Sequence, residues 1–334
     1  MQKILIIQTA FIGDVVLATS IVEKLHQHFP DASIDFLVRK GNESLFTDHP
    51  FLHEVLVWNK KENKLKNLFN LLFKIRKTKY DVVINVQRYG ATGLLTAFSG
   101  AKATIGFDKN PFSFLFIKKI KHVFDEKGNG KHEIERNFEL IKDLTDNIIV
   151  RPKLYPSKND EEKTKIYKQR PYITVAPASV WFTKQYPADK WISFINKLPE
   201  NLNVYLLGAP PDKIISDNII GSTINKNVID LCGKLSFLES CSLMKDALMN
   251  YVNDSAPMHF ASAVNAPVSS IFCSTIPAFG YGPLSDKKFI IEIQEQLYCR
   301  PCGLHGYKAC PEKHFRCAKE ITDEQLLSTL TSTN

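Results

Sequence analysis

One stretch of the chain combines residues that suit the binding of an anion. A short strand-like run ends at Asp254, Ser255 follows, and Pro257 stands where the first turn of a helix tolerates proline. Residues 258–264 can form that helix, and residues 268–272 the next strand. In such a unit the first N–H groups of the helix lie at the carboxyl end of the sheet and can bind a diphosphate. The pattern is also typical of plain helix capping by Asp254 and Ser255, and both interpretations stay open.

Two further strands in the same half are expected to end in polar loops. The strand at 172–176 leads to Ser179 and Lys184, and the next strand leads to Asp212. The carboxyl ends of parallel strands meet at one edge of a sheet, where open α/β sheets bind their ligands. We therefore expect these side chains to converge with Asp254.

The elements that must position these residues alternate along the whole chain. Strand-like apolar runs and helical patterns follow one another, which predicts α/β layers with parallel sheets. At 334 residues the chain exceeds the usual size of a single core, so we expect two doubly wound, Rossmann-like domains. A charged, proline-marked segment at 151–170 separates them, which places the domains at 1–155 and 156–321. A terminal helix at 322–334 completes the chain, and it could pack back toward the N-terminal domain.

The first half opens with a strand at 3–7, a turn, and a helix that starts at Asp14. The single Gly13 in this turn does not make the G-x-G-x-x-G pattern of a dinucleotide site. Asp14 is either the cap of the helix or a group that acts in the chemistry. The strands that follow are expected at 33–38, 55–58, 80–86 and 104–107.

Basic residues are concentrated between Lys60 and Lys79. Eight Lys and Arg side chains there oppose the single Glu62, and apolar residues recur at helical spacing. This basic amphipathic helix is either a solvated surface helix or a face for an anionic substrate or anionic lipid. Aromatic residues are not interleaved with the lysines as a nucleic-acid platform requires, so we exclude nucleic acid as a partner.

The lengths of the apolar runs also indicate where the protein is located. No run approaches the ~18 residues that a membrane span needs. The residues at 1–7 lack the length and the cleavage site of a signal peptide. We therefore expect a cytoplasmic protein, with peripheral membrane contact left open.

Four of the seven cysteines crowd into 19 residues as C-x2-C-x7-C-x6-C. In a reducing compartment this spacing is compatible with zinc-bound thiolates and with reduced structural thiols, and less so with disulfides. These four are Cys299, Cys302, Cys310 and Cys317. The remaining three stand singly among apolar neighbours and are expected to be small core residues: Cys232, Cys241 and Cys273.

Five stretches, taken in order, resemble the ADP-heptose:lipopolysaccharide heptosyltransferases of glycosyltransferase family 9. They are Phe11-Ile12-Gly13-Asp14, Ala176–Ser179 with Lys184–Pro187, Gly208–Pro210, Asp254–His259, and the cysteine tail. The resemblance implies a GT-B fold, with an N-terminal acceptor domain, a C-terminal nucleotide-sugar domain and a cleft between them. It also implies an inverting transfer of heptose from ADP-heptose to the inner core of lipopolysaccharide, possible association with the inner membrane, and no cofactor for the chemistry.

Inversion in one step needs a base for the acceptor hydroxyl, together with cations or amide dipoles for the departing diphosphate. The resemblance makes Asp14 the base and Lys184 the phosphate-binding lysine. We expect donor binding at Ser179, Lys184, Gly208, Asp212, Asp254, Ser255, Ala256, Met258 and His259, where Asp212 could accept hydrogen bonds from the ribose hydroxyls. We expect acceptor binding at Thr9, Gly13, Arg88, Lys118 and Lys119, and the three cations are candidates for binding acceptor carboxylates or phosphates. Packing of His259 in the core, capping by Asp212 and an ordinary loop position for Lys184 are the structural alternatives.

The sequence departs from the family pattern at two points. Ala256 stands where the family has glycine, and its methyl group lies where the backbone could approach a phosphate closely. Gln185-Tyr186 replaces the middle of the family's Lys-Arg-Trp-Pro. Two other classes stay open: a different sugar-nucleotide enzyme, such as an epimerase-like protein or another sugar transferase, and a non-catalytic nucleotide-sugar-binding protein that could dispense with Asp14.

Overall fold

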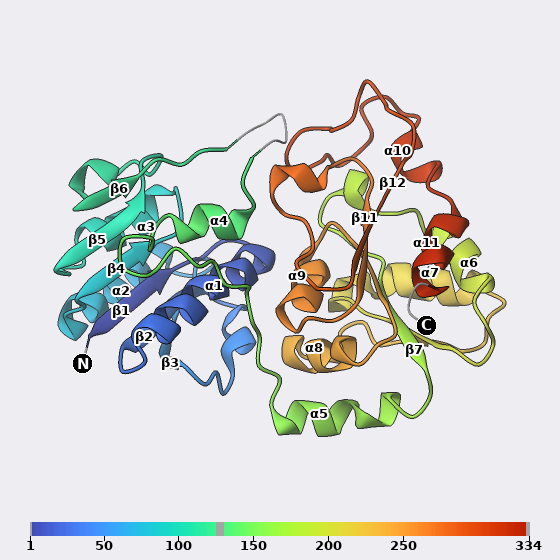
Figure 1. Cartoon of the computed structure of the whole chain (residues 1–334), viewed down its shortest axis with the longest axis horizontal. Helices are drawn as coiled ribbons and strands as arrows, with labels where there is room; N and C mark the ends of the chain where they lie inside the picture. Colours follow the sequence, from blue (N-terminus) through green and yellow to red (C-terminus); the bar gives the residue numbers. More distant parts are fainter. Residues whose placement is uncertain (1, 125–129, 332–334) are drawn as a thin grey trace. The chain divides into compact units, whose positions relative to one another are not determined.

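The computed structural model describes residues 2–124 and 130–331, which form two compact units, each with its own six-stranded sheet (Figure 1). Unit 1 lies within Met1–Phe124 and Lys131–Tyr155, and unit 2 contains the described residues from Pro156 on, together with Gly130. All strand pairs are parallel, so the predicted fold class is confirmed. The role of each unit stays a prediction.

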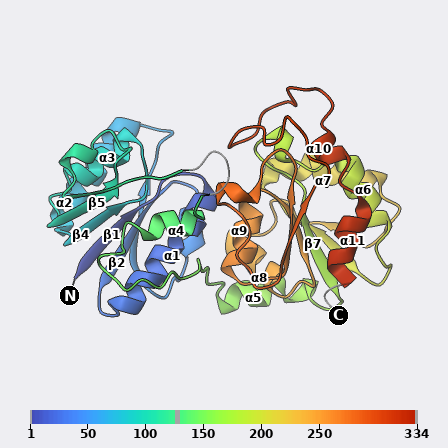
Figure 2. The same ribbon diagram turned by 45° about the horizontal axis from the view of Figure 1, so that its top comes forward.

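Unit 1 has the strand order β3-β2-β1-β4-β5-β6. The chain therefore reverses direction across the sheet between β1 and β4, as in a doubly wound domain. In Figure 2, α2 and α3 cover one face of the sheet, and α1 and α4 cover the other. The strands are β1 Lys3–Ile7, β2 Ser33–Arg39, β3 Leu52–Trp58, β4 Val82–Asn85, β5 Ala103–Phe107 and β6 Lys118–Ile120. The helices are α1 Ile12–His28, α2 Lys64–Thr78, α3 Gly90–Ala97 and α4 Glu133–Phe138, with short 3-10 turns η1 Glu43–Phe46 and η2 Ser113–Leu115.

Unit 2 repeats this topology with the order β12-β11-β10-β7-β8-β9, and its chain reverses between β7 and β10. Figures 1 and 2 show α8 and α9 on one face of the sheet, and α6, α7 and α11 on the other. The strands are β7 Tyr172–Ala176, β8 Asn203–Leu206, β9 Val228–Asp230, β10 Asn250–Asn253, β11 Val268–Phe272 and β12 Lys288–Glu292. The helices are α5 Lys158–Thr164, α6 Ala188–Asn196, α7 Lys213–Ser222, α8 Phe237–Lys245, α9 Ala256–Ala263, α10 Arg316–Lys319 and α11 Asp323–Thr331. The 3-10 turns are η3 Lys165–Tyr167, η4 Phe182–Lys184, η5 Pro210–Asp212 and η6 Pro277–Phe279.

The central strands are buried on both faces, which is why their sequences are continuous apolar runs. In β1, the four residues after Lys3 are all fully buried, and Ile4 pairs with Ile34 of β2 and Val82 of β4. Each such aliphatic side chain contributes about 1.5–3 kcal/mol when it leaves water. Two edge strands, β6 and β12, lack this pattern because they are short or half-exposed, and the sequence reasoning missed both.

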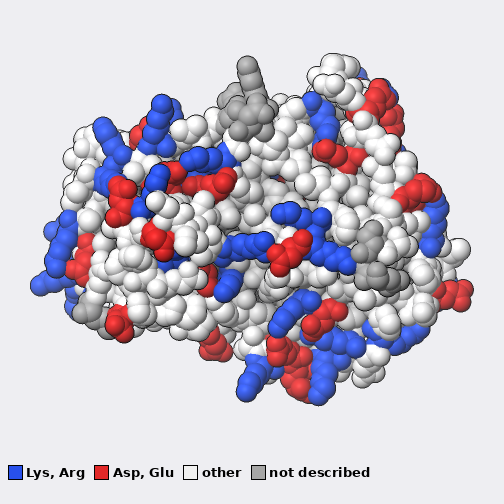
Figure 3. Space-filling view, in the orientation of Figure 1, with Lys and Arg blue, Asp and Glu red and all other residues white. Residues whose placement is uncertain are grey.

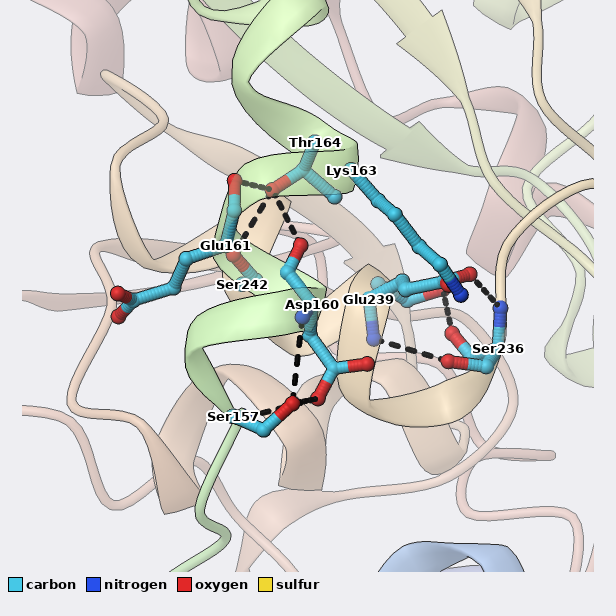
Figure 4. A network of polar contacts seen from close by, with 9 residues as sticks. Ser157, Asp160, Glu161, Lys163, Thr164, Ser236, Glu239 and Ser242 are labelled. Atoms are coloured by element: carbon cyan, nitrogen blue, oxygen red, sulfur yellow. Dashed lines mark hydrogen bonds and ion pairs between the residues drawn. The ribbon is translucent and has the colours of Figure 1, made fainter.

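The expected linker at 151–170 contains a helix that belongs to unit 2. Ser157 and Asp160 form a reciprocal capping box at the start of α5 (Figure 4). Thr164 Oγ1 lies 2.9 Å from Ser242 Oγ of α8, and Lys163 Nζ lies 2.7 Å from Glu239 Oε1 of the same helix. The linker prediction was therefore too long, because a charged segment without an apolar core can still dock through hydrogen bonds.

The terminal helix α11 packs within unit 2. Leu326 is fully buried in the core of that unit, and Tyr251 Oη donates a hydrogen bond of 3.1 Å to its carbonyl oxygen. Ser193 of α6 donates a hydrogen bond to Asp323 at 2.5 Å. The expectation that this helix could pack back toward the N-terminal domain is thus corrected.

The basic helix α2 is amphipathic, as predicted. Its inner face buries three aliphatic residues in the core of unit 1: Leu68, Leu71 and Ile75. Its sequence carries five Lys and Arg residues and no Asp or Glu, whereas charges of both signs are interspersed over the face shown in Figure 3. Neither α2 nor any other helix in the described part of the chain is long and apolar enough to cross a membrane.

Candidate active site

The two strands at the reversal point of unit 2 bring Lys184 and Asp254 together. Lys184 ends η4, in the loop after β7, and Asp254 directly follows β10. Lys184 Nζ lies 2.7 Å from Asp254 Oδ2, and Thr275 Oγ1 donates to the same oxygen at 2.6 Å. Only 15% of the Lys184 side chain and 9% of the Asp254 side chain are exposed. The predicted convergence of these two groups is therefore present as a largely buried ion pair.

The N-terminus of α9 begins two residues after Asp254. Ser255 occupies the N-cap position but makes no side-chain capping hydrogen bond, since its hydroxyl donates to Asn253 O at 3.4 Å. Plain capping therefore does not account for this pair of residues. The first N–H groups of a helix and its positive dipole end favour a bound anion. A lysine charge and a helix N-terminus thus meet at one edge of the sheet of unit 2.

A frame of hydrogen bonds holds the Lys184 loop. Asn253 Oδ1 accepts from the backbone N–H of Tyr186 at 2.9 Å, and its amide nitrogen donates to Pro177 O at 2.8 Å. Gln185 Nε2 donates to Ser179 O at 2.5 Å, and Tyr186 is buried. The two residues that depart from the family pattern therefore brace the loop. Sequence reasoning missed Asn253, although its position at a strand end could have indicated it.

The loop after β8 places Asp212 close to Gly208. Asp212 Oδ2 accepts from the backbone N–H of Ala209 at 2.8 Å, so it closes this turn. A Cβ atom at Gly208 would lie 2.9 Å from the same oxygen, which leaves no room for a side chain there. The capping interpretation of Asp212 accounts for one carboxylate oxygen, and its proposed contact with ribose stays a prediction.

The remaining donor residues differ in exposure. Ser179 and Ala256 are half-buried. Met258 is fully buried and its N–H donates to Ser255 O at 3.1 Å, while the His259 side chain is also buried in α9. Both positions fit packing against the sheet, and their donor contacts stay predictions.

The reversal point of unit 1 carries a second polar group. Thr9 Oγ1 donates to Gln87 Oε1 at 2.6 Å, which joins the segments after β1 and β4, and both side chains are buried. Asp14 lies half-buried in the first turn of α1, whose N-cap residue is Phe11. The helix thus begins before Asp14, and Gly13 lies inside its first turn. Asp14 is therefore not the N-cap residue that the sequence suggested as an alternative.

Lys60 belongs to this edge of the sheet rather than to α2, where the sequence placed it. Its Nζ donates to Thr9 O at 2.7 Å and lies 4.7 Å from the ring centroid of Trp58. Burial, with Arg39 and Lys64 nearby, lowers the pKa of Lys60 from its ordinary value to about 8. The position of Lys60, two residues after β3, is the signal that could have revealed it.

The other predicted acceptor contacts do not form one cluster. Lys118 and Lys119 are neighbours on β6, so their side chains point to opposite faces of the sheet, and Lys118 pairs with Asp143. Arg88 is exposed and lies three residues after the end of β4. Burial, followed by the charge of Arg88, lowers the pKa of His122 to about 4. Arg136 and Lys109 also contribute positive charge near His122. The acceptor contacts of Arg88, Lys118 and Lys119 stay predictions.

The four C-terminal cysteines gather beside the core of unit 2. Cys302 Sγ lies 3.2 Å from Cys299 O, and Cys299 Sγ lies 3.8 Å from His314 Nε2. Burial raises the pKa of Cys317 to about 12, with further contributions from Cys302, Cys310 and Cys299. All seven cysteines are free thiols. No three or more His, Cys, Asp or Glu residues within 2–124 and 130–331 are arranged to hold a metal ion, so the structural zinc stays a prediction.

Comparison with known proteins shows the family to which this chain belongs. The sequence model of glycosyltransferase family 9 (heptosyltransferase) matches residues 68–309, more than half of the chain. The chain belongs to glycosyltransferase family 9. Lipopolysaccharide heptosyltransferase 3 of Escherichia coli K12 is 26% identical over 281 residues, which cover 80% of this chain and 81% of that protein.

Two solved structures extend the likeness of this family 9 glycosyltransferase to its whole length. E. coli ADP-heptose lps heptosyltransferase II matches with a TM-score of 0.82 at 20% identity, and the matched region covers 99% of this chain and 98% of that chain. E. coli heptosyltransferase WaaC, solved with ADP, has a TM-score of 0.75 at 15% identity over the full length of both chains. The fold is therefore GT-B, as the family resemblance implied.

Proposed function

We propose that this family 9 glycosyltransferase transfers heptose from ADP-heptose to the inner core of lipopolysaccharide, with inversion at the anomeric carbon. The observation that carries the proposal is the buried Lys184–Asp254 pair beside the N-terminus of α9. A lysine ammonium has three donors, and Asp254 occupies one of them. The others can bind diphosphate oxygens, which the helix amides also attract. The names of the similar E. coli proteins support ADP-heptose as donor and lipopolysaccharide as acceptor.

In the proposed reaction, a hydroxyl oxygen of the acceptor forms a bond to the anomeric carbon of the heptose. The bond between this carbon and the diphosphate oxygen breaks, and ADP leaves with the electron pair. The hydroxyl proton passes to the carboxylate of Asp14, which acts as general base. Lys184 stabilises the negative charge that develops on the leaving diphosphate. The atoms and electrons of this transfer balance without a further reactant.

The proposed acceptor is anionic, and two cations that follow strands of unit 1 suit it. Lys60 lies against Thr9, and Arg88 is exposed after Gln87. Both follow strands at the carboxyl edge of the sheet, where ligands of doubly wound domains bind. Membership in family 9 favours this transferase over an epimerase-like enzyme. A non-catalytic binding protein would not need the proposed base Asp14, so the role of Asp14 distinguishes the two.

We also propose that α2 holds the enzyme at the cytoplasmic face of the inner membrane. Leu65, Phe69 and Phe73 are spaced by four residues on one face of α2, and all three are exposed. The helix carries only basic charges, which complement anionic lipid headgroups. A basic helix with exposed aromatic residues is typical of a segment that lies in a membrane interface.

The donor proposal is tested by calorimetry with ADP and UDP on the native protein and on Lys184→Gln. We expect ADP to bind more tightly than UDP. Glutamine can still donate a hydrogen bond to Asp254 but carries no charge, so ADP affinity should fall roughly 10- to 100-fold. Lys163→Gln, which removes an ion pair of the same length on α5, is the matched control and should bind ADP normally. Equal or tighter binding of UDP would contradict the assignment of the donor.

A further inference from the structure

The segment Arg300–Tyr307, which we call the clasp, lies inside the cysteine tail and holds both loops that carry the Lys184–Asp254 pair. One end of the clasp pairs with η4, which ends in Lys184. The other end binds the loop after β11, which contains Thr275. The family resemblance gives this segment no role in donor binding.

The first arm of the clasp fixes the residue before Lys184. Thr183 N–H donates to Tyr307 O at 3.1 Å, and Tyr307 N–H donates to Thr183 Oγ1 at 2.7 Å. Ser274 Oγ donates to the same hydroxyl at 3.0 Å. Thr183 is buried, so these partners replace water and define its position. Lys184 therefore starts from a backbone that the clasp has fixed.

The second arm fixes the partner of Asp254. The guanidinium of Arg300 donates to three backbone carbonyls around the end of β11, at 2.8 Å to Cys273 O, 3.2 Å to Phe272 O and 2.9 Å to Thr275 O. Cys302 N–H donates to Ser274 O at 2.8 Å. Thr275, held in this way, donates its hydroxyl to Asp254 Oδ2. One short segment thus supports both members of the ion pair.

The glycine at the Thr183 end of the clasp has no space for a side chain. A Cβ atom at Gly306 would lie 2.8 Å from Thr183 Oγ1 and 3.3 Å from Lys184 Cγ. Gly303, in the same segment, also has a left-handed backbone, but a Cβ atom there would meet only Tyr307 Oη, at 3.5 Å. The two φ angles are +75° and +69°, so substitution strains both backbones alike. Only Gly306 is also a close contact of the Lys184 loop.

We infer that the clasp is a positioning element of the diphosphate site, and that Thr183, Arg300 and Gly306 are positioning residues for Lys184 and Asp254. The inference rests on the proposed function, because it requires Lys184 to bind the diphosphate. A binding group displaced by a fraction of an ångström loses much of its hydrogen-bond energy, so a change in the clasp that shifts Thr183, Lys184 or Asp254 weakens donor binding without contacting the donor.

The test compares Gly306→Ala with Gly303→Ala in ADP calorimetry and thermal unfolding. Both variants should lower the Tm, Gly303→Ala by roughly 2–4 °C because it strains a left-handed residue, and Gly306→Ala by more because its Cβ also meets Thr183 Oγ1. Only Gly306→Ala should weaken ADP binding, by about tenfold. The KM for the donor should rise with it, while the KM for the acceptor stays unchanged. Equal ADP affinity of the two variants would overturn the inference.

A second pair of variants keeps the test decisive if Gly306→Ala does not fold. Thr183→Val removes the hydroxyl that accepts from Tyr307 and Ser274, and Thr183→Ser retains it. Valine should weaken ADP binding, and serine should restore it. Identical affinities of these two variants would likewise overturn the inference. If instead the native protein binds no ADP, or Lys184→Gln binds it normally, the proposed function itself fails.

Discussion

Lys184 and Asp254 form an ion pair whose two charges compensate one another where little water reaches them. Removal of one partner from a buried ion pair typically costs about 3–5 kcal/mol, because the other charge is left without compensation. Here Thr275 also donates to Asp254, so the carboxylate keeps one partner when Lys184 moves toward a phosphate. The pair is therefore suited to exchange contacts with an anion rather than only to stabilise the fold.

Asp14 provides the prediction that separates catalysis from binding. Asp14→Asn keeps the shape of the side chain but removes its basicity, so turnover should fall by roughly 10²–10⁴-fold. ADP affinity should not change, because the proposed donor contacts lie in unit 2. The variant also loses a carboxylate from the first turn of α1, which costs only about 0.3–1 kcal/mol of stability. Turnover, ADP affinity and Tm are measured on the same preparations.

The control for this experiment is Asp189→Asn, which removes an exposed carboxylate from the first turn of α6. It should lose a similar amount of stability and keep full turnover. Normal turnover of Asp14→Asn at normal stability would remove Asp14 from the mechanism.

At the scale of residues, the sequence predicted that Lys184 and Asp254 approach one another but not that they form an ion pair. Lys184 and Asp254 could be placed at the same edge because the carboxyl ends of parallel strands meet there. Their direct ion pair, and the bracing by Asn253, depend on loop conformations that no periodicity records. Lys60 was missed for the same reason, since its ammonium lies over the ring of Trp58 and donates to Thr9 O.

At the scale of elements, α2 exposes large apolar side chains that a membrane could bury. Its exposed fractions are 68% for Leu65, 48% for Phe69 and 69% for Phe73. Burial of such side chains contributes about 1.5–3 kcal/mol each, and a basic residue near anionic lipid adds about 1 kcal/mol. These magnitudes are sufficient for reversible binding to an anionic bilayer.

We predict that the protein sediments with vesicles of phosphatidylglycerol and phosphatidylcholine but not with phosphatidylcholine alone. The double variant Phe69→Ser, Phe73→Ser should lose most of this binding, and high salt should weaken that of the native protein. The control is Ile214→Ser on α7, an exposed aliphatic residue of unit 2. Equal binding to both kinds of vesicle would contradict the electrostatic part of the proposal. Self-association that disappears in the double variant would show that a second copy covers this face instead.

The sequence predicted elements best where apolar runs are long. The strand at 268–272 was placed as observed, and the helix expected at 258–264 begins two residues earlier, at Ala256. The sequence did not predict α5, because its seven residues KNDEEKT contain no apolar side chain. Such a helix forms through its capping box and its contacts with α8, which a hydrophobic pattern cannot reveal.

At the scale of the whole molecule, the two units have the same strand order and reverse at the same place in that order. The sequence could predict this because alternating strands and helices leave few other parallel arrangements. In each unit, the candidate groups lie at the reversal point, Thr9 with Gln87 in unit 1 and Lys184 with Asp254 in unit 2. The proposed binding of the donor at the reversal point of unit 2 and of the acceptor at that of unit 1 stays a prediction.

This division can be tested by hydrogen exchange on the full chain. A ligand that binds only the native state adds about 2.7 kcal/mol of stability at 100 times its Kd, and it slows exchange most where it binds. We predict that ADP protects the segments around Lys184 and Asp254 and leaves those around Thr9 and Gln87 unchanged.

Lys184→Gln is the control, since it should lose this protection at the same ADP concentration while the exchange of the unit 1 core stays native. ADP protection confined to residues 9–14 and 85–88 would reverse the roles of the two units. It would make the cations beside Thr9 the ligands of the nucleotide. Protection in unit 2 alone would instead support the binding of the acceptor by Lys60 and Arg88. These cations belong to unit 1, whose reversal point is the other one in the described chain.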